Sequence, residues 1–332
     1  MDVLAIERLN VEIAQAAGAL HPVQDVSLRV GQGETVCVVG ESGCGKSLTA
    51  LAVMDLLPRR ASRRAQRLEF MGEDLLGLSS RRMSDVRGRR MAMIFQEPMT
   101  CLNPCYTVGD QLSETLVRHQ GASRRAAMDR AAEMLEKVGI RPAGERLRQY
   151  PHQLSGGLRQ RVMIAMALMC SPALIIADEP TTALDVTIQA QILVLLAELQ
   201  REFRMGAVLI THDLSVVARV ASRVVVMYAG QVVETGDPAE IFNRPAHPYT
   251  QGLLRCLPVP GRVPPGSRLG SIPGLVPTLM AGLTGCHFRN RCPLAREACR
   301  ESVALRPLGP GREMRCVLEP AESGTAWSRE RP

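Results

Sequence analysis

The sequence predicts an α/β fold in which a mainly parallel sheet is covered by helices. Short apolar runs alternate with segments of helical periodicity, a pattern typical of β–α–β units. The runs are apolar throughout, as expected of strands buried on both faces. The predicted strands are Thr35–Val39, Met91–Phe95, Leu174–Ala177, Ala207–Ile210 and Val224–Met227. The predicted helices are Leu48–Leu57, Arg124–Val138, Leu158–Met169 and Thr187–Phe203.

The length and composition fit a water-soluble protein with one large domain and a smaller appendix. The chain has 332 residues, of which 46% are hydrophobic and 22% are charged. No run of about 18 or more apolar residues occurs, so we expect no membrane-spanning helix. The N-terminal MDVLAIERLN carries acidic residues and favours a strand over a secretory signal. We therefore expect the chain to stay in the cytosol.

The net charge of +7 is compatible with nucleic acid, with an anionic membrane surface, or simply with a high arginine content. Arginines concentrate in Arg59–Arg67 and Arg81–Arg90, and such runs are usually solvated loops, which is the interpretation we favour. Aromatic residues make up only 3% of the chain, so stacking surfaces for single-stranded nucleic acid are poorly supplied. We expect no nucleic-acid partner.

The segment GESGCGKS at 40–47 fits the phosphate-binding pattern G-x-x-x-x-G-K-[ST] between a predicted strand and a predicted helix. Its glycines let several backbone N–H groups face one anion, and the helix N-terminus adds its positive dipole end. Lys46 would neutralise the β- and γ-phosphates, and the Ser47 hydroxyl would bind Mg²⁺. The same dipole would favour a reactive thiolate at Cys44. The predicted nucleotide-binding residues here are Gly40, Glu41, Ser42, Gly43, Cys44, Gly45, Lys46, Ser47 and Leu48.

Two acidic residues follow the apolar strand Leu174–Ala177. An acid at the carboxyl end of a buried strand lies beside the nucleotide in P-loop folds, so we assign Asp178 to Mg²⁺. Glu179 would point differently and suits the general base for an attacking water. Without the phosphate-binding loop, an ordinary strand end would be the better interpretation of these two residues.

A second glycine-bearing helix start, LSGGLRQRV, begins at Leu154 and lacks a lysine. Ser155 can cap the helix, while Gly156 and Gly157 allow backbone N–H groups to approach a phosphate. These residues alone leave open whether both phosphate-binding segments, the one at 40–47 and the one at Leu154, bind the same nucleotide within a single chain.

Six motifs in order resemble the ATP-binding subunits of ABC transporters. They are Walker A (Gly40–Ser47), the Q-loop IFQEP with Gln96, the LSGG signature, Walker B ending at Asp178 and Glu179, the D-loop TALD (Thr182–Asp185), and THD with His212. The resemblance implies a P-loop NTPase fold with a helical signature subdomain. It also implies a head-to-tail dimer in which each ATP lies between one Walker A and the signature of the other subunit.

The same resemblance implies the roles of the remaining site residues. Glu179 polarises the attacking water, His212 senses the γ-phosphate, and Gln96 contacts both Mg²⁺ and that water. Asp185 joins the nucleotide-binding residues together with Ser155, Gly156 and Gly157 of the partner. The cofactors implied are ATP and Mg²⁺, the latter bound by Ser47, Gln96 and Asp178.

Longer segments resemble the dipeptide/oligopeptide permease ATPases, and their sequences are closer to those of the D-type subunit than to those of the F-type subunit. They include MIFQEPMTCLNPCYTVGDQL, PHQLSGGLRQRVMIAMAL and HPYTQGLLRCLP. This resemblance implies an F-type ATPase partner, two transmembrane permease subunits and an extracytoplasmic substrate-binding protein, with the chain peripheral on the cytoplasmic face of the membrane. Importers of nickel, glutathione or other small solutes share such cassettes and stay open as alternatives. A non-transport ABC ATPase acting on nucleic acid is less favoured, because neither a coiled-coil insertion nor a second cassette is present.

The C-terminal quarter changes in composition. The domain prediction is an ATPase domain over 1–256, a Pro/Gly-rich linker over 257–285, a small Cys-rich domain over 286–320 and a disordered tail over 321–332. Four of the ten cysteines fall in the third part: Cys286, Cys292, Cys299 and Cys316. In a cytosolic protein such clustering favours metal over disulfides.

The spacing of these cysteines discriminates poorly between metals. The tight C-x₂₋₄-C pair of a structural zinc site is absent, wider gaps can suit an iron–sulfur cluster, and free thiols also stay open. The resemblance to peptide-permease ATPases favours a four-iron, four-sulfur cluster, for which we expect a structural role. His287 is expected to be a bystander.

One departure from the family pattern concerns adenine. The family has an aromatic residue before the second strand, near Ala17 in this chain, and only the imidazole of His21 lies close by in the sequence. We expect adenine stacking either to be weak or to use His21.

Overall fold

The computed structural model describes residues 2–16, 18–96, 101–181, 184–257, 270–280 and 283–323. The chain divides into two compact units. The first unit comprises Met1–Leu4, Arg29–Thr35 and Glu69–Ile210. The second comprises Ala5–Leu28, Val36–Leu68 and Thr211–Pro332. Among the predicted features, Ala17, Thr182, residues 258–269 and 281–282 of the linker, and most of the tail lie outside the described residues.

The first unit contains three parallel strands, β7 (Met91–Ile94), β8 (Leu174–Asp178) and β9 (Gly206–Ile210). Every residue of β8 and β9 is buried, as the apolar runs predicted. Register places Asp178 opposite Ile210 at the carboxyl ends of β8 and β9. The strands therefore deliver the two acidic residues at 178 and 179 to one edge of this sheet, where ligands bind in open α/β folds.

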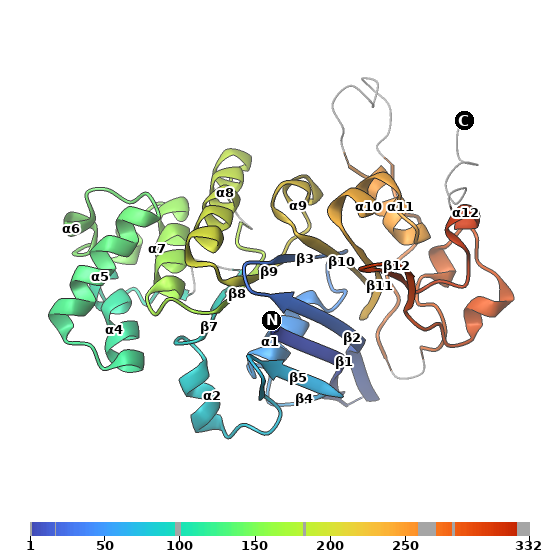
Figure 1. Cartoon of the computed structure of the whole chain (residues 1–332), viewed down its shortest axis with the longest axis horizontal. Coiled ribbons are helices and arrows are strands. Elements are labelled where there is room, and N and C mark those ends of the chain that lie inside the picture. Colours follow the sequence, from blue (N-terminus) through green and yellow to red (C-terminus); the bar gives the residue numbers. More distant parts are fainter. Residues whose placement is uncertain are drawn as a thin grey trace. The chain divides into compact units, whose positions relative to one another are not determined.

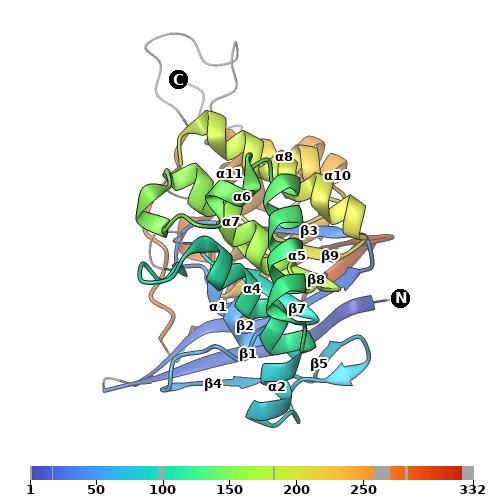
Figure 2. The same cartoon turned by 90° about the vertical axis from the view of Figure 1, so that its left-hand side faces the viewer.

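Helices form most of the rest of the first unit (Figures 1 and 2). Helices α4, α5 and α7 contact one another, and α7 also contacts β7 and α8. Side chains of Thr107, Ser123, Ser155 and Asp185 cap α4, α5, α7 and α8, each accepting backbone N–H groups of the first turn. The bounds are α2 (Ser80–Val86), α4 (Val108–Gln120), α5 (Arg124–Lys137), α6 (Ala143–Arg146), η1 (Pro151–Gln153), α7 (Gly156–Leu168) and α8 (Val186–Phe203).

The second unit is built around β3 (Thr35–Val39), which pairs in parallel with β10 (Arg223–Tyr228). From β10 the pairing continues antiparallel to β11 (Gln231–Gly236), then β13 (Arg312–Met314) and β12 (Arg306–Gly309). Its helical elements are α1 (Lys46–Val53), α9 (Leu214–Val220), α10 (Pro238–Asn243), α11 (Pro248–Arg255), η2 (Arg289–Arg291), η3 (Glu297–Arg300) and α12 (Pro320–Ser323).

The long strands β1 (Asp2–Gln15) and β2 (Gly18–Gly31) each cross from one unit into the other along the chain. Strand β1 pairs antiparallel with β4 (Ala61–Arg64), and β5 (Arg67–Phe70) pairs antiparallel with β6 (Glu73–Asp74). The strand predicted at the N-terminal MDVLAIERLN is confirmed by β1. The others, β2, β4, β5 and β6, were not predicted, because their polar residues interrupt the apolar runs used to find buried strands. The prediction of a mainly parallel sheet therefore holds for the central strands but omits these antiparallel ones.

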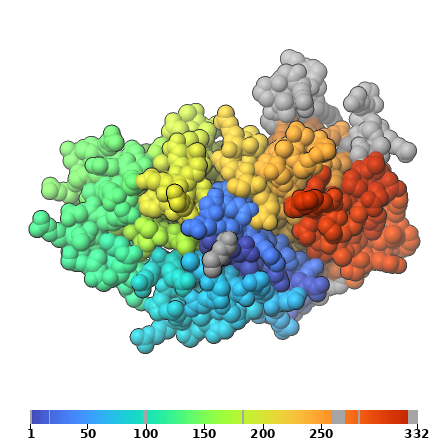
Figure 3. Space-filling view, in the orientation of Figure 1, coloured from blue at the N-terminus to red at the C-terminus, as the bar shows by residue number. Residues whose placement is uncertain are grey.

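The structure does not support an independent Cys-rich domain. Strand β13 pairs with β11, so the segment that carries the cysteines extends the sheet that contains β3. Phe288 packs against Tyr228 of β10 and Tyr249 of α11, with ring centroids 5.1 and 5.4 Å apart. In the space-filling view this segment forms one continuous mass with α10 and α11 (Figure 3). The C-terminal part is thus a portion of the second unit's own core.

Candidate nucleotide-binding site

The predicted phosphate-binding loop joins β3 to α1 in the second unit. Helix α1 begins at Lys46, two residues earlier than predicted, and ends at Val53, after which Asp55 adopts a left-handed conformation (φ 54°). Gly40 and Gly45 also have positive φ, 153° and 99°. A Cβ atom on Gly40 would lie 2.2 Å from the Met227 carbonyl oxygen, and one on Gly45 would lie 2.1 Å from that of Pro22. Only glycine lets the loop fold this tightly.

Lys46 is held inside this loop. Its side chain is buried, and Nζ donates to the carbonyl oxygens of Gly40 and Glu41 at 2.9 and 3.0 Å. The ammonium therefore lies within the curl of the loop, where an anion would meet both its charge and the N-terminus of α1.

The prediction of a reactive Cys44 is wrong. The thiol is fully buried, and burial raises its pKa, although the neighbouring Lys46 acts in the opposite direction. Desolvation of the anion thus outweighs both the ammonium and the helix N-terminus. Cys44 instead packs against the loop, since its Sγ would lie 2.9 Å from a Cβ on Gly40.

Glu41 connects the loop to residues far along the chain, which the sequence motifs did not indicate. Its backbone N–H donates to the Tyr249 hydroxyl at 2.9 Å. Its carboxylate accepts two bonds from the Arg291 guanidinium, at 2.6 and 3.1 Å. Arg291 precedes Cys292 directly, so the cysteine-bearing segment contacts the phosphate-binding loop.

In the first unit, Glu179 has a left-handed backbone conformation (φ 44°), which is uncommon for a residue other than glycine. Its N–H donates to the Ile210 carbonyl at 2.9 Å. The Gln96 amide donates to Oε2 of Glu179 at 3.1 Å. The structure therefore brings together two of the three predicted catalytic residues at the ends of β7 and β8, while Asp178 is buried in β8.

The predicted signature lies at the start of α7. Ser155 is exposed, and its hydroxyl caps the helix by accepting from the Leu158 N–H at 3.4 Å. A Cβ on Gly157 would lie 3.1 Å from Ile188 Cγ2 of α8, whereas one on Gly156 would meet only Leu184 at 3.6 Å. Gly157 thus also serves packing between α7 and α8, while Gly156 leaves the helix start open.

Two further predicted residues flank helices. Asp185 caps α8, accepting from the N–H groups of Thr187 and Ile188 at 3.1 and 3.0 Å. Beside it, Val186 is 83% exposed. In the second unit, His212 is exposed and precedes Asp213, the N-cap of α9. His21 is half-buried, and its N–H donates to the Leu279 carbonyl at 2.7 Å.

We call Cys286, Cys292, Cys299 and Cys316 the cysteine quartet. Burial raises the pKa of the Cys286 thiol to about 11 and that of Cys292 to about 12, and in both cases other thiols of the quartet add to the rise. The Cys286 N–H also donates to the Cys299 carbonyl at 2.8 Å, so these two residues are neighbours. Within the described parts of the chain, however, no three His, Cys, Asp or Glu side chains are arranged to hold a metal ion. His287 is buried with Nδ1 2.7 Å from the Ala229 carbonyl oxygen, as expected of a bystander.

Each thiol of the quartet nevertheless has a backbone N–H group directed at its sulfur. Arg296 donates to Cys299 and Leu318 to Cys316, both at 3.4 Å. Backbone hydrogen bonds from Phe288 and Leu294 lower the pKa of Cys286 and Cys292 against the effect of burial. Such donors stabilise thiolate rather than thiol, so the donor set suits an anionic, metal-bound state.

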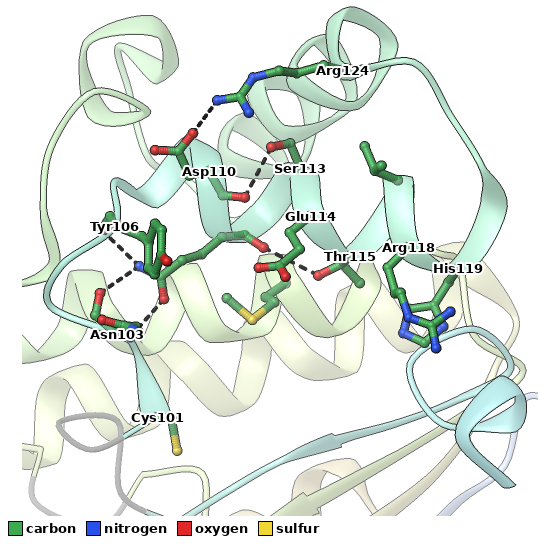
Figure 4. Close-up of a pocket in the computed structure, with 13 residues that line it drawn as sticks. Cys101, Asn103, Tyr106, Asp110, Ser113, Glu114, Thr115, Arg118, His119 and Arg124 are labelled. Atoms are coloured by element: carbon green, nitrogen blue, oxygen red, sulfur yellow. Dashed lines mark hydrogen bonds and ion pairs between the residues drawn. The ribbon is translucent and has the colours of Figure 1, made fainter. Parts of the chain in front are cut away.

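A groove of about 900 Å³ runs along α4 in the first unit (Figure 4). Its lining begins at Cys101, five residues after Gln96. Tyr106 and Val117 are exposed there, 56% and 41% respectively. Charged side chains of both signs surround them, namely Asp110, Glu114, Arg118 and Arg124. None of the described helices is both long and apolar enough to cross a bilayer.

Known proteins resemble this chain over nearly its whole length. The family model described as "ABC transporter" matches residues 23–182, and "Oligopeptide/dipeptide transporter, C-terminal region" matches residues 233–299. The dipeptide transport ATP-binding protein DppD of Escherichia coli is 50% identical over 317 residues, covering 95% of this chain and 96% of that protein. DppD of Bacillus subtilis is 51% identical over 302 residues, covering 90% and 88%.

Solved structures agree on the cassette fold. CbiO1 of Clostridium perfringens, part of the ABC transporter complex cbiONQ, is 26% identical with a TM-score of 0.63, covering 73% of this chain and 91% of that one. The cassette MJ0796 in its dimeric structure is 27% identical with a TM-score of 0.64, covering 71% and 98%. The predicted resemblance is confirmed: the chain belongs to the ABC transporter family, among the ATP-binding proteins of its dipeptide and oligopeptide branch.

Proposed function

We propose that this chain hydrolyses ATP to energise the uptake of dipeptides or oligopeptides. The observation that carries the hydrolysis step is the hydrogen bond between Gln96 and Glu179, together with the left-handed backbone of Glu179. Strained backbone of this kind concentrates at functional sites. Glu179 accepts the proton of the attacking water, and Gln96 orients both the carboxylate and that water.

The motifs assign the remaining roles. Lys46 and the N–H groups of the loop 40–48 would bind the β- and γ-phosphates, and Ser47, Gln96 and Asp178 would hold Mg²⁺. His212 contacts the γ-phosphate. The metal supplies charge neutralisation on the phosphates when it is bound.

The dimer follows from the contrast between a buried Lys46 and an exposed Ser155. The helix start at Ser155 is exposed, and the backbone N–H groups of the half-buried Gly156 and Gly157 suit a phosphate brought by a second ATPase subunit. Val186, 83% exposed beside Asp185, supplies an apolar contact for the same interface. Since the relatives carry the D-type name, the partner we propose is an F-type subunit.

We place the membrane subunits at the groove along α4. A short cytoplasmic helix of a permease subunit would set apolar side chains on Tyr106 and Val117 and polar ones on the surrounding charges. The groove starts five residues after Gln96, so docking there is close in the chain to the residue that contacts Glu179. This arrangement places the chain on the cytoplasmic face of the membrane, with two permease subunits and an extracytoplasmic binding protein completing the importer.

The substrate class comes from the relatives' names: DppD proteins are dipeptide transport ATP-binding proteins, and a Brucella abortus relative, 50% identical over 311 residues, is a putative peptide import ATP-binding protein. The test is uptake of a labelled dipeptide by cells in which the gene has been deleted and then restored. The wild-type gene should restore uptake, whereas Glu179→Gln should not.

Glu198→Gln is the matched control, because Glu198 is an exposed acid on α8 of the same unit. It should restore uptake fully. If Glu179→Gln transports as well as the wild type, the hydrolytic assignment fails. If deletion leaves dipeptide uptake intact but stops uptake of nickel or glutathione, the peptide assignment fails.

We further propose that the cysteine quartet binds a four-iron, four-sulfur cluster that stabilises the C-terminal segment. Four thiols, two of them buried and two half-buried, with a backbone N–H directed at each sulfur supply the donor number and the hydrogen bonds that such clusters use. Protein purified without oxygen should contain about four irons and four sulfides per chain. Cys292→Ser should lose them, while Cys256→Ser, outside the quartet, should keep them. Stoichiometric zinc without iron would overturn the proposal.

A further inference from the structure

We infer that Arg291 is a positioning residue for nucleotide binding: it neutralises Glu41 and holds the phosphate-binding loop in its binding conformation. The inference rests on the proposed ATP-binding function and assigns a role to a residue outside the six motifs. It makes the cysteine-bearing segment part of the nucleotide site.

The guanidinium of Arg291 uses all of its hydrogen-bonding capacity at this point. Nη1 and Nη2 donate to the two carboxylate oxygens of Glu41, at 2.6 and 3.1 Å. The other three bonds go to the Tyr228 hydroxyl at 3.3 Å, the Ile272 carbonyl at 3.0 Å and the Pro273 carbonyl at 2.9 Å. Five donors in a fixed fork match the five N–H groups of arginine, and lysine could supply only three.

Burial makes this ion pair stronger than an ordinary surface pair. The Arg291 side chain is 6% exposed and that of Glu41 is 27% exposed. The Arg291 guanidinium also lies over the Tyr228 ring, 5.7 Å from its centroid. Bidentate, charge-assisted bonds in such surroundings are screened little by solvent. The pair is therefore suited to fixing the position of Glu41.

Glu41 is in turn fixed at its backbone. Its N–H donates to Tyr249, and its carbonyl oxygen accepts from Lys46 Nζ at 3.0 Å. The residue that Arg291 holds is thus bonded directly to the lysine predicted to contact the phosphates. A change at Arg291 reaches Lys46 through a single residue.

A second contact joins the same C-terminal segment to the other side of the loop. The Leu279 carbonyl accepts from the His21 N–H at 2.7 Å, and the next residue, Pro22, places its carbonyl where a Cβ on Gly45 would lie. Arg291 therefore contacts the phosphate-binding loop through Glu41, and Leu279 supports the residues that pack against Gly45.

The direction of the effect follows from charge. Glu41 belongs to the loop that receives a highly anionic triphosphate, and Arg291 cancels its negative charge. Without Arg291, an unpaired carboxylate in this loop would repel the phosphates, and nucleotide affinity would fall. Removing the charge of Glu41 as well should then restore affinity, because the repulsion disappears with it.

The test measures binding of a fluorescent ATP analogue to the full chain, with Mg²⁺ and Glu179→Gln to prevent turnover. Arg291→Ala should raise Kd about tenfold, within the usual range of coupling between neighbouring sites. Adding Glu41→Gln to Arg291→Ala should recover most of the lost affinity. Glu41→Gln alone is measured as the third corner of the double-mutant cycle, so that the recovery is judged against its own Kd.

The matched control is Arg300→Ala. Arg300 also adjoins a cysteine of the quartet and forms an ion pair, but with Glu297 on the surface. The Arg300→Ala variant should bind the ATP analogue with the same Kd as the parent. The inference is overturned if Arg291→Ala binds like the parent, or if Glu41→Gln gives no recovery while the melting temperature falls, since the contact would then serve stability alone. A parent that binds no nucleotide would instead overturn the proposed function.

Discussion

The two helix starts that carry glycines differ in how complete they are. In the second unit, the loop before α1 encloses a buried Lys46, and its Glu41 is bonded to Tyr249 and Arg291. In the first unit, α7 begins at an exposed Ser155 that bonds only its own first turn among the contacts described. The loop before α1 forms a complete anion site, whereas the start of α7 provides only half of one. A chain with one whole site and one half site is suited to pairing with another chain.

The largest expected effect removes the lysine from the complete site. Lys46→Ala should raise the Kd for MgATP about a hundredfold, because a hydrogen-bonded charge within the loop is lost. Isothermal titration of the full chain measures this, with Arg29→Ala, an exposed arginine of the first unit, as the control. An unchanged Kd would show that the loop before α1 is not the nucleotide site.

A smaller effect should separate the half site from the complete one. Ser155→Ala should lower ATP hydrolysis by the assembled transporter about tenfold, because one hydrogen bond to the transferred phosphate is lost. It should leave the Kd of the isolated chain for MgATP unchanged. Phosphate release and titration together measure the two quantities. If Ser155→Ala weakens binding to the isolated chain, both helix starts serve one nucleotide within the chain, and the dimer proposal fails.

The smallest expected effect concerns pH and the core behind the complete site. Burial lowers the pKa of His247 to about 3, so the folded state keeps this imidazole neutral. Its contribution to stability is full above the unfolded pKa near 6.5 and is lost as pH falls from there towards 3. At pH 5.5 the loss from this residue is on the order of 1 kcal/mol.

Urea unfolding at pH 7.5 and 5.5 measures this loss. His247→Asn keeps an acceptor for the Tyr249 N–H at the start of α11 and should flatten the pH dependence by that amount. His152→Asn, at an exposed histidine of the first unit, should not. If the free energy of unfolding depends on pH equally in the wild type and both variants, His247 does not contribute to the acid sensitivity. Burial also lowers the pKa of His287 in the same unit, so we expect some acid sensitivity to persist.

The sequence predicted the strands and the phosphate-binding loop, because both depend on residues that are close together along the chain. Strands β3, β8 and β9 are continuous apolar runs, and glycines in fixed spacing identified the loop that follows β3. The pairing of Gln96 with Glu179 required the resemblance, since 83 residues separate them. Residues 97–100, 182–183, 258–269 and 281–282 lie outside the described parts, so the D-loop prediction for Thr182 stays a prediction.

What the sequence could not predict depends on distant contacts and on burial. Arg291 and Glu41 are 250 residues apart, and nothing in their spacing indicates that they meet. The Cys44 thiol was expected to ionise because of its helix end, but its burial decides its pKa. The cysteine segment was expected to form its own domain because its composition changes, yet β13 joins it to β11. The local pattern of residues shows neither how far a side chain is removed from solvent nor which strands pair with each other.

The distance along the chain between Glu41 and Arg291 also has a consequence for biosynthesis. The phosphate-binding loop leaves the ribosome 250 residues before the arginine that neutralises its acid. Until translation is nearly finished, the nascent cassette carries an uncompensated carboxylate where the triphosphate would bind. On the inference above, products truncated before Arg291 should bind ATP about tenfold more weakly than the complete chain.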